Sequence, residues 1–97
     1  MIFSKAYDLS EDQYRHIREM LYELGPHHIF SGNDTQGSVD IFHFNGSTLG
    51  FYKTKKEIFL LQVDSEVKEG VDGTASKLEK LTGNKLVERK WQEINIL

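Results

Sequence analysis

Four histidines are the side chains of this sequence whose chemistry best suits metal binding. His27 and His28 are neighbours on an expected strand, so their side chains point to opposite faces and are poorly placed to bind one ion. A site that combines one of them with His43 and an acid, Asp34 or Asp40, remains an alternative, and it would make the chain a small metal-dependent enzyme. Surface or half-buried histidines explain the same spacing. We therefore expect neither a metal site nor a cofactor.

Hydroxyl groups and glycine-rich segments do not complete a catalytic motif. Ser31 and Ser65 lack the strained turn, the neighbouring base and the oxyanion pocket that a serine nucleophile needs. The segment 70–74 precedes an expected helix and could hold an anion, but it lacks the lysine and the spacing of a phosphate loop, so helix capping explains it better. The chain has no cysteine, which excludes disulfides, thiolate zinc sites and cysteine nucleophiles. We expect that the protein is not an enzyme.

Aromatic rings in the middle of the chain are better suited to binding. Phe42, Phe44 and Phe51 stand beside Lys53 and Gln62 in the expected sheet. This combination is similar to the stacking platforms on which sheets bind single-stranded nucleic acid, where rings contact bases and cations contact phosphates. The same rings could instead form a core that the C-terminal segment or a second copy of the chain covers. Both alternatives remain open from the sequence.

The first of two expected hairpins positions these rings. Asn45-Gly46 tolerates the positive φ values of a type I′ turn, and strand-like residues flank it over 38–44 and 47–54. The resulting register places Phe42 opposite Leu49.

The second hairpin is expected to turn at Lys55-Lys56 and to continue in a strand over 57–64. A two-residue turn there places Phe51 opposite Leu60. One face of the sheet then gathers five apolar residues, which we predict to bind a partner: Phe42, Phe44, Leu49, Phe51 and Leu60. The opposite face is also apolar, with Val39, Ile41, Tyr52, Phe59, Leu61 and Val63. Because one layer of helices covers only one face, the other face needs a partner, a second layer or a ligand.

A helix is expected on each side of the hairpins. Ser10 and Gln13 form a capping box, and an apolar stripe runs from there to Leu24, before Gly25 and Pro26 end the first helix. The second helix is expected to begin near 72–74 and to end at Gly83-Asn84.

Short strands are expected at 2–7 and 27–30, with a loop over 31–37. Residues 85–97 fit neither period cleanly, and we favour a strand or an extended arm with Trp91 packed on the sheet. The fold class predicted is α+β, an antiparallel sheet of four to five strands with two helices packed on one face.

Length and composition set the outer bounds. The 97 residues form one domain, 1–97, with 38% hydrophobic and 28% charged residues. No apolar run is long enough to span a bilayer, and the N-terminus lacks a secretory signal, so we expect a cytoplasmic protein without a membrane partner. The formal net charge of −3 argues against coating nucleic acid through the whole surface, although a local basic patch remains compatible with it.

One short stretch resembles a known family. The sequence 48–54, Thr-Leu-Gly-Phe-Tyr-Lys-Thr, followed by 58–62, Ile-Phe-Leu-Leu-Gln, resembles a hairpin of the TATA-box-binding-protein-like domains appended to ribonuclease HIII and to the ribonuclease LS toxin. In those domains the first strand ends in Tyr-Lys-Thr or Tyr-Lys-Ser and the second closes with Gln-Gly; here Lys55-Lys56 replaces the turn glycine and Val63 stands in place of the last one. The resemblance implies a similar sheet between two helices and a nucleic-acid-binding role.

Two functions follow from these observations. The leading expectation is a non-enzymatic module that docks a protein partner, or its own copy in a homodimer, through the five-residue aromatic face. The alternative is a nucleic-acid-binding domain of the TATA-box-binding-protein-like kind, which uses the same face together with Lys53, Lys55 and Lys56.

Overall fold

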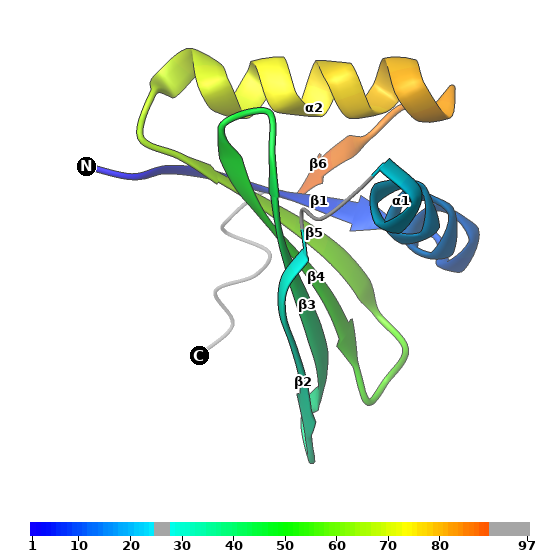
Figure 1. The fold of residues 1–97 in the computed structure, drawn as a ribbon. Helices are drawn as coiled ribbons and strands as arrows, with labels where there is room; N and C mark the ends of the chain where they lie inside the picture. The colour runs from blue at the N-terminus through cyan, green and yellow to red at the C-terminus, as the bar shows by residue number, and fades with distance from the viewer. Residues whose placement is uncertain (25–27, 90–97) are drawn as a thin grey trace.

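The computed structural model of the chain describes residues 1–24 and 28–89. Within them the elements follow in the order β1 (Phe3–Leu9), α1 (Glu11–Leu24), β2 (His28–Asp34), β3 (Gly37–Phe44), β4 (Ser47–Thr54), β5 (Phe59–Ser65), α2 (Lys68–Thr82) and β6 (Val87–Arg89) (Figure 1). The expected Trp91 contact and His27 lie outside the described residues.

A single antiparallel sheet contains all the described strands, in the order β2-β3-β4-β5-β1-β6. Strands β2 to β5 form a meander, and β1 pairs with the far side of β5. The α+β class is confirmed, with six strands where the sequence predicted four to five. The short β6 falls in the segment for which a strand or an arm was expected. Strand β2 extends to Asp34, because the polar residues that predicted a loop pair with β3 instead.

The hairpin between β3 and β4 has the predicted register. Asn45 and Gly46 have φ values of 54° and 77°, as a type I′ turn requires. Phe44 pairs with Ser47, and Phe42 pairs with Leu49.

The hairpin between β4 and β5 differs from the prediction, because its loop has three residues. The backbone N–H of Glu57 donates to the carbonyl of Thr54 at 2.9 Å, and the N–H of Thr54 donates to the carbonyl of Ile58 at 3.0 Å. Glu57 itself has a φ of 59°, the left-handed conformation that ends a type I turn in three-residue hairpin loops. Lysine disfavours a positive φ. In the three-residue loop Glu57 takes the positive φ, so neither Lys55 nor Lys56 has to adopt it.

The extra loop residue shifts the register of β5 by one position. Phe51 pairs with Leu61, and Leu60 pairs with Tyr52. A shift of one residue moves every side chain of a strand to the opposite face. The predicted pairing of Phe51 with Leu60 is therefore wrong, and the apolar residues of β5 that join Phe42 and Phe51 are Phe59, Leu61 and Val63.

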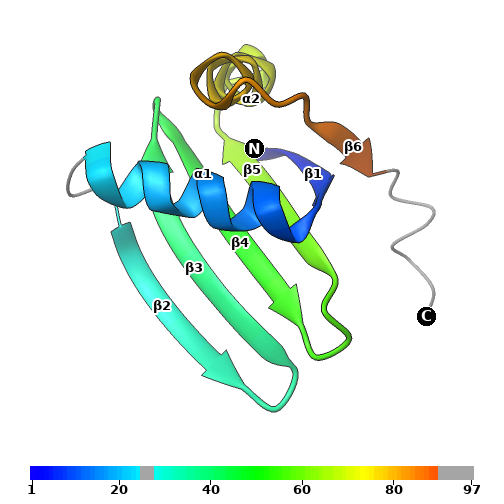
Figure 2. The same ribbon diagram turned by 90° about the vertical axis from the view of Figure 1, so that its right-hand side faces the viewer.

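Both helices cover that same face of the sheet, and the predicted one-sided packing is confirmed. Helix α1 runs across β3, β4 and β5, whereas α2 lies at the end of the sheet near the Asn45-Gly46 turn (Figure 2). One hydrophobic core forms between the two layers, and its fully buried members include Ile17, Leu21, Phe42, Leu49, Phe51, Leu61, Val63 and Leu78. No described helix is long and apolar enough to cross a membrane.

The helix ends follow from local sequence. In α1, the Ser10 hydroxyl accepts from the N–H of Gln13 at 3.1 Å, and the Gln13 side chain accepts from the N–H of Ser10 at 3.0 Å, which confirms the capping box. Helix α2 ends at Thr82, and the residue that caps it, Gly83, has a φ of 73°. It begins at Lys68, earlier than expected, so the segment 70–74 lies inside the helix and is not an N-terminal anion site.

The left-handed residue in the second hairpin makes a testable stability prediction. Replacing Glu57→Gly removes the steric cost of a positive φ, and we expect the free energy of unfolding to rise by about 0.5–1 kcal/mol in urea denaturation. Lys56→Gly is the matched control; because Lys56 does not have a positive φ, it should lower stability by about 0.5 kcal/mol. Destabilisation by Glu57→Gly would contradict the three-residue loop.

Candidate functional site

The predicted partner-binding residues do not form one surface. Phe42, Leu49 and Phe51 have 0% exposure, and Phe44 has 7%. The Phe51 ring meets Tyr14 of α1 edge-on, with 6.2 Å between ring centroids. These four residues are core, and Leu60 lies on the opposite face of the sheet because of the register shift.

The predicted nucleic-acid-binding lysines are also separated. Lys53 lies on the helix-covered face, where its Nζ is 5.8 Å from the centroid of the Phe59 ring. Lys55 and Lys56 are exposed in the loop after β4. Only these two remain together at the surface.

The histidine and carboxylate set considered for a metal is not assembled either. His43 is on the face away from the helices, whereas His28 and Asp40 are on the helix side. Within residues 1–24 and 28–89, no three acidic, histidine or cysteine side chains converge as ion ligands.

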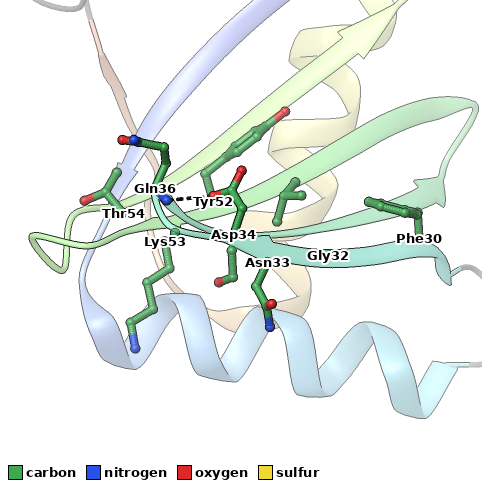
Figure 3. Close-up of a pocket in the computed structure, with 11 residues that line it drawn as sticks. Phe30, Gly32, Asn33, Asp34, Gln36, Tyr52, Lys53 and Thr54 are labelled. Atoms are coloured by element: carbon green, nitrogen blue, oxygen red, sulfur yellow. Dashed lines mark hydrogen bonds between the residues drawn. The ribbon is translucent and has the colours of Figure 1, made fainter.

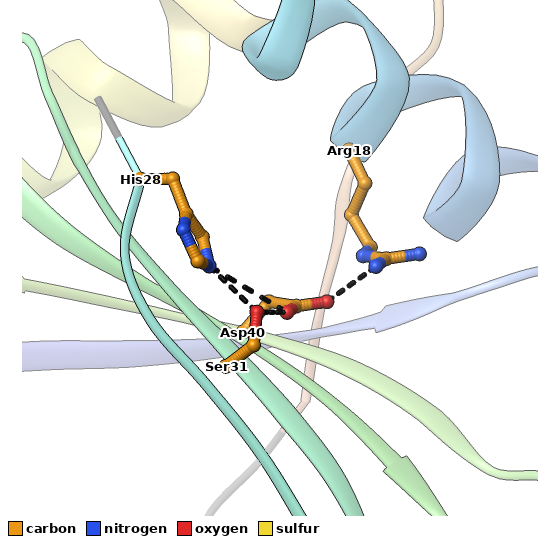
Figure 4. Close-up of polar contacts among 4 residues, drawn as sticks. All are labelled: Arg18, His28, Ser31 and Asp40. Atoms are coloured by element: carbon orange, nitrogen blue, oxygen red, sulfur yellow. Dashed lines mark hydrogen bonds and ion pairs between the residues drawn. The ribbon is translucent and has the colours of Figure 1, made fainter. Parts of the chain in front are cut away.

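A polar cluster joins α1 to β2 and β3 (Figure 4). Arg18 Nη2 lies 2.5 Å from Asp40 Oδ2, and Asp40 is only 6% exposed. The Ser31 hydroxyl donates to Asp40 Oδ1, and His28 Nε2 lies 2.6 Å from Ser31 Oγ. This cluster was not predicted. Its one signal in the sequence is Asp40, a carboxylate on the same face of its strand as Phe42 and Phe44, because a charge on a face that helices cover needs a counter-charge.

The cluster contains serine, histidine and aspartate but does not activate the serine. In a catalytic triad, one histidine nitrogen accepts the serine proton while the other donates to the carboxylate. Here a single nitrogen, His28 Nε2, faces both Ser31 Oγ and Asp40 Oδ1, the latter at 3.8 Å, and the serine proton goes to the carboxylate. These contacts connect α1 to β2 and β3. The His28 ring also packs against the Phe42 ring, with 5.2 Å between their centroids.

The face of the sheet away from both helices, called the open face below, carries the other candidate site. Its central apolar residues are Val39, Ile41, Tyr52 and Leu60, all partly exposed, and Phe30 at its β2 edge is 55% exposed. Between Phe30 and Tyr52 lies a cavity of about 470 Å³. We call it the aromatic groove; its lining includes Phe30, Gly32, Asp34, Gln36, Val39, Tyr52 and Thr54 (Figure 3).

Two glycines leave room for the rings of Phe30 and Tyr52. A Cβ on Gly32 would come within 2.9 Å of the Phe30 ring, and a Cβ on Gly50 would come within 2.8 Å of the Tyr52 ring. The edge of each ring therefore occupies the space that a side chain at its glycine would fill. The rings form the walls of the groove, and Val39 lies between them on the middle strand.

Two ionisable side chains of the open face, Tyr52 and Asp34, line the groove. Burial raises the pKa of the Tyr52 phenol, and the negative charge of Asp64 raises it further, so the hydroxyl remains protonated at neutral pH. Asp34 stands at the hairpin end, where its Oδ1 accepts from the N–H of Gln36 at 2.7 Å. Lys53 also borders the cavity, but its side chain extends to the helix side of the sheet (Figure 3).

Comparison with known proteins adds no relative. No protein-family model matches the chain, and no curated protein or solved structure is significantly similar to it.

The buried ion pair predicts a stability effect. Asp40→Asn preserves size but leaves the half-buried Arg18 guanidinium without its counter-charge, so we expect a loss of about 1–3 kcal/mol in the free energy of unfolding by urea. Asp12→Asn, at an exposed position of α1, is the control and should change stability by less than about 0.5 kcal/mol. Equal effects of the two substitutions would show that the cluster does not fasten α1 to the sheet.

Proposed function

We propose that this protein is a non-enzymatic binding module that docks an extended segment of a partner protein in the aromatic groove of its open face. The observation that carries the proposal is the pair of aromatic walls, Phe30 and Tyr52, which line an apolar cavity that residues 1–24 and 28–89 leave uncovered, while both helices pack on the other face. Apolar grooves with a few polar groups at the rim are typical binding sites.

The edge strand beside the groove supports an extended ligand. β2 ends the described sheet on this side, and most of its residues are exposed. An edge strand presents unpaired backbone N–H and C=O groups, with which a peptide in β conformation can pair. Ile29 and Phe30, respectively 50% and 55% exposed, add apolar area at the same edge.

A second copy of the chain is one such partner, as the sequence prediction of a homodimer proposed. In that case β2 of one copy would supply the extended segment for the other. Light scattering separates the two cases, because self-docking doubles the 11.2 kDa mass of the chain and a foreign partner leaves it unchanged.

The groove makes a direct prediction for peptide binding. We expect peptides selected from an unbiased displayed library to bind the wild-type protein with micromolar affinity, and Tyr52→Ala to weaken them about ten-fold because it removes one wall. Leu81→Ala is the control, since Leu81 is an exposed apolar residue on α2, and it should leave the affinity unchanged. Peptides that bind Tyr52→Ala as well as wild type would refute docking in the groove.

Nucleic acid remains the second candidate, and a specific observation favours it. Phe30 and Tyr52 present aromatic rings on an open sheet, and Lys55 and Lys56 are exposed at the loop beyond β4. This is also the role that the resemblance to TATA-box-binding-protein-like domains implies. Against it stand the carboxylates of the open face, Asp8, Asp34 and Asp64, which repel phosphates.

Substitution of the two loop lysines, Lys55 and Lys56, tests nucleic-acid binding. If single-stranded oligonucleotides bind the open face, Lys55→Ala with Lys56→Ala should lower the affinity about three-fold and reduce the salt slope by about one to two. Lys68→Ala with Lys80→Ala removes two exposed lysines of α2 and is the matched control. Fluorescence anisotropy over a range of salt measures both, and the same response in the two double variants would exclude recognition by this loop.

A further inference from the structure

Asp34 and Asp64 are open-face carboxylates without an ion-pair partner among the described residues, and of the two only Asp34 lines the aromatic groove. Of the other open-face carboxylates, Asp8 lies 3.2 Å from Arg89 Nη1, whereas Asp64 accepts from the neutral Gln62 amide at 3.0 Å. Asp34 has no cation within ion-pair distance among the described residues. Its backbone contact with Gln36 holds one carboxylate oxygen in place and leaves the charge itself without a partner.

The aromatic walls, like Asp34, favour a positively charged ligand. Phe30 is 55% exposed and Tyr52 is partly exposed, so a side chain in the groove that they line can reach both rings. The face of an aromatic ring carries negative electrostatic potential and attracts a cation, most strongly a guanidinium that can also stack on it. Val39 between the rings offers an apolar floor for the methylene stem of a long basic side chain.

We propose that the aromatic groove recognises an arginine side chain in the docked segment, with the guanidinium over Phe30 or Tyr52 and paired with Asp34. The proposal rests on the proposed function, because it assigns the chemistry of the segment that the open face binds. Arginine fits better than lysine, since its planar group stacks on a ring and pairs with a carboxylate at the same time. A phosphate backbone has the opposite requirement, because Asp34 repels it.

The test uses a small molecule that carries a single arginine side chain. N-acetyl-arginine methylamide is titrated into the isotopically labelled full chain, with the citrulline derivative as the uncharged analogue of similar shape. We expect saturable NMR shifts centred on Gly32, Val39 and Tyr52, with a dissociation constant of about 10 mM for arginine and at least three-fold weaker binding for citrulline.

The charge is then removed from the protein. Asp34→Asn retains an oxygen that can accept from the N–H of Gln36, so the hairpin turn is preserved, and we expect it to weaken arginine binding about three-fold and to abolish the preference over citrulline. Glu66→Gln, at an exposed carboxylate beyond β5, should leave both unchanged.

Three results would overturn the inference: no saturable shift, shifts centred outside the groove, or a preference for arginine that survives in Asp34→Asn. If selected peptides still depend on Tyr52 in that case, docking on the open face stands and only the arginine assignment fails. If peptide binding is also independent of Tyr52, both fail. Oligonucleotide binding that tightens in Asp34→Asn would instead assign the groove to a polyanion.

Discussion

The left-handed backbone at Glu57 sets which apolar side chains this sheet buries. A three-residue loop rather than a two-residue turn moves β5 by one position, and the alternation of side chains then assigns Phe59, Leu61 and Val63 to the helix side. Those residues join Phe42 and Phe51 under α1 and α2 in a single core. Leu60 goes to the open face as a direct consequence.

The two faces consequently have different roles. On the helix side, Arg18 and Asp40 form a charged contact beside the hydrophobic core, and this contact connects α1 to β3. On the open face, Gly32 and Gly50 leave room for the rings of Phe30 and Tyr52, which line the groove together with Val39. Stability and proposed binding thus occupy opposite sides of the same strands, and substitutions in the groove need not disturb the core.

Much of this fold could be predicted from local sequence. The Ser10 capping box and the Asn45-Gly46 turn depend on neighbouring residues alone, and both are as predicted. The second hairpin could not be predicted in the same way, because no glycine or asparagine marks the left-handed position that Glu57 occupies. The helices cover only one of the two apolar faces of the described sheet, as expected, but the sequence did not indicate which one. Four of the five residues predicted to bind a partner lie on the covered face.

The candidate site was harder to predict for a different reason. Phe30 and Gly32 lie in a stretch whose serine, glycine, asparagine and aspartate residues indicate a loop, yet β3 recruits that stretch into the sheet. Tertiary pairing therefore created the β2 wall of the groove, whereas Tyr52 was correctly placed on the face opposite Phe42 and Phe51. The role proposed for Asp34 could not be predicted either, because it depends on the position of Asp34 beside the rings of Phe30 and Tyr52.

Solvent access to the aromatic rings shows which face of the sheet the helices cover. A soluble paramagnetic agent added to the full chain broadens NMR signals of protons that solvent reaches. We predict that the ring protons of Phe30 and Tyr52 broaden, while those of Phe42 and Phe51 remain sharp. Sharp signals from Phe30 and Tyr52 with broadened signals from Phe42 and Phe51 would contradict it, because the face with the groove would then be the covered one.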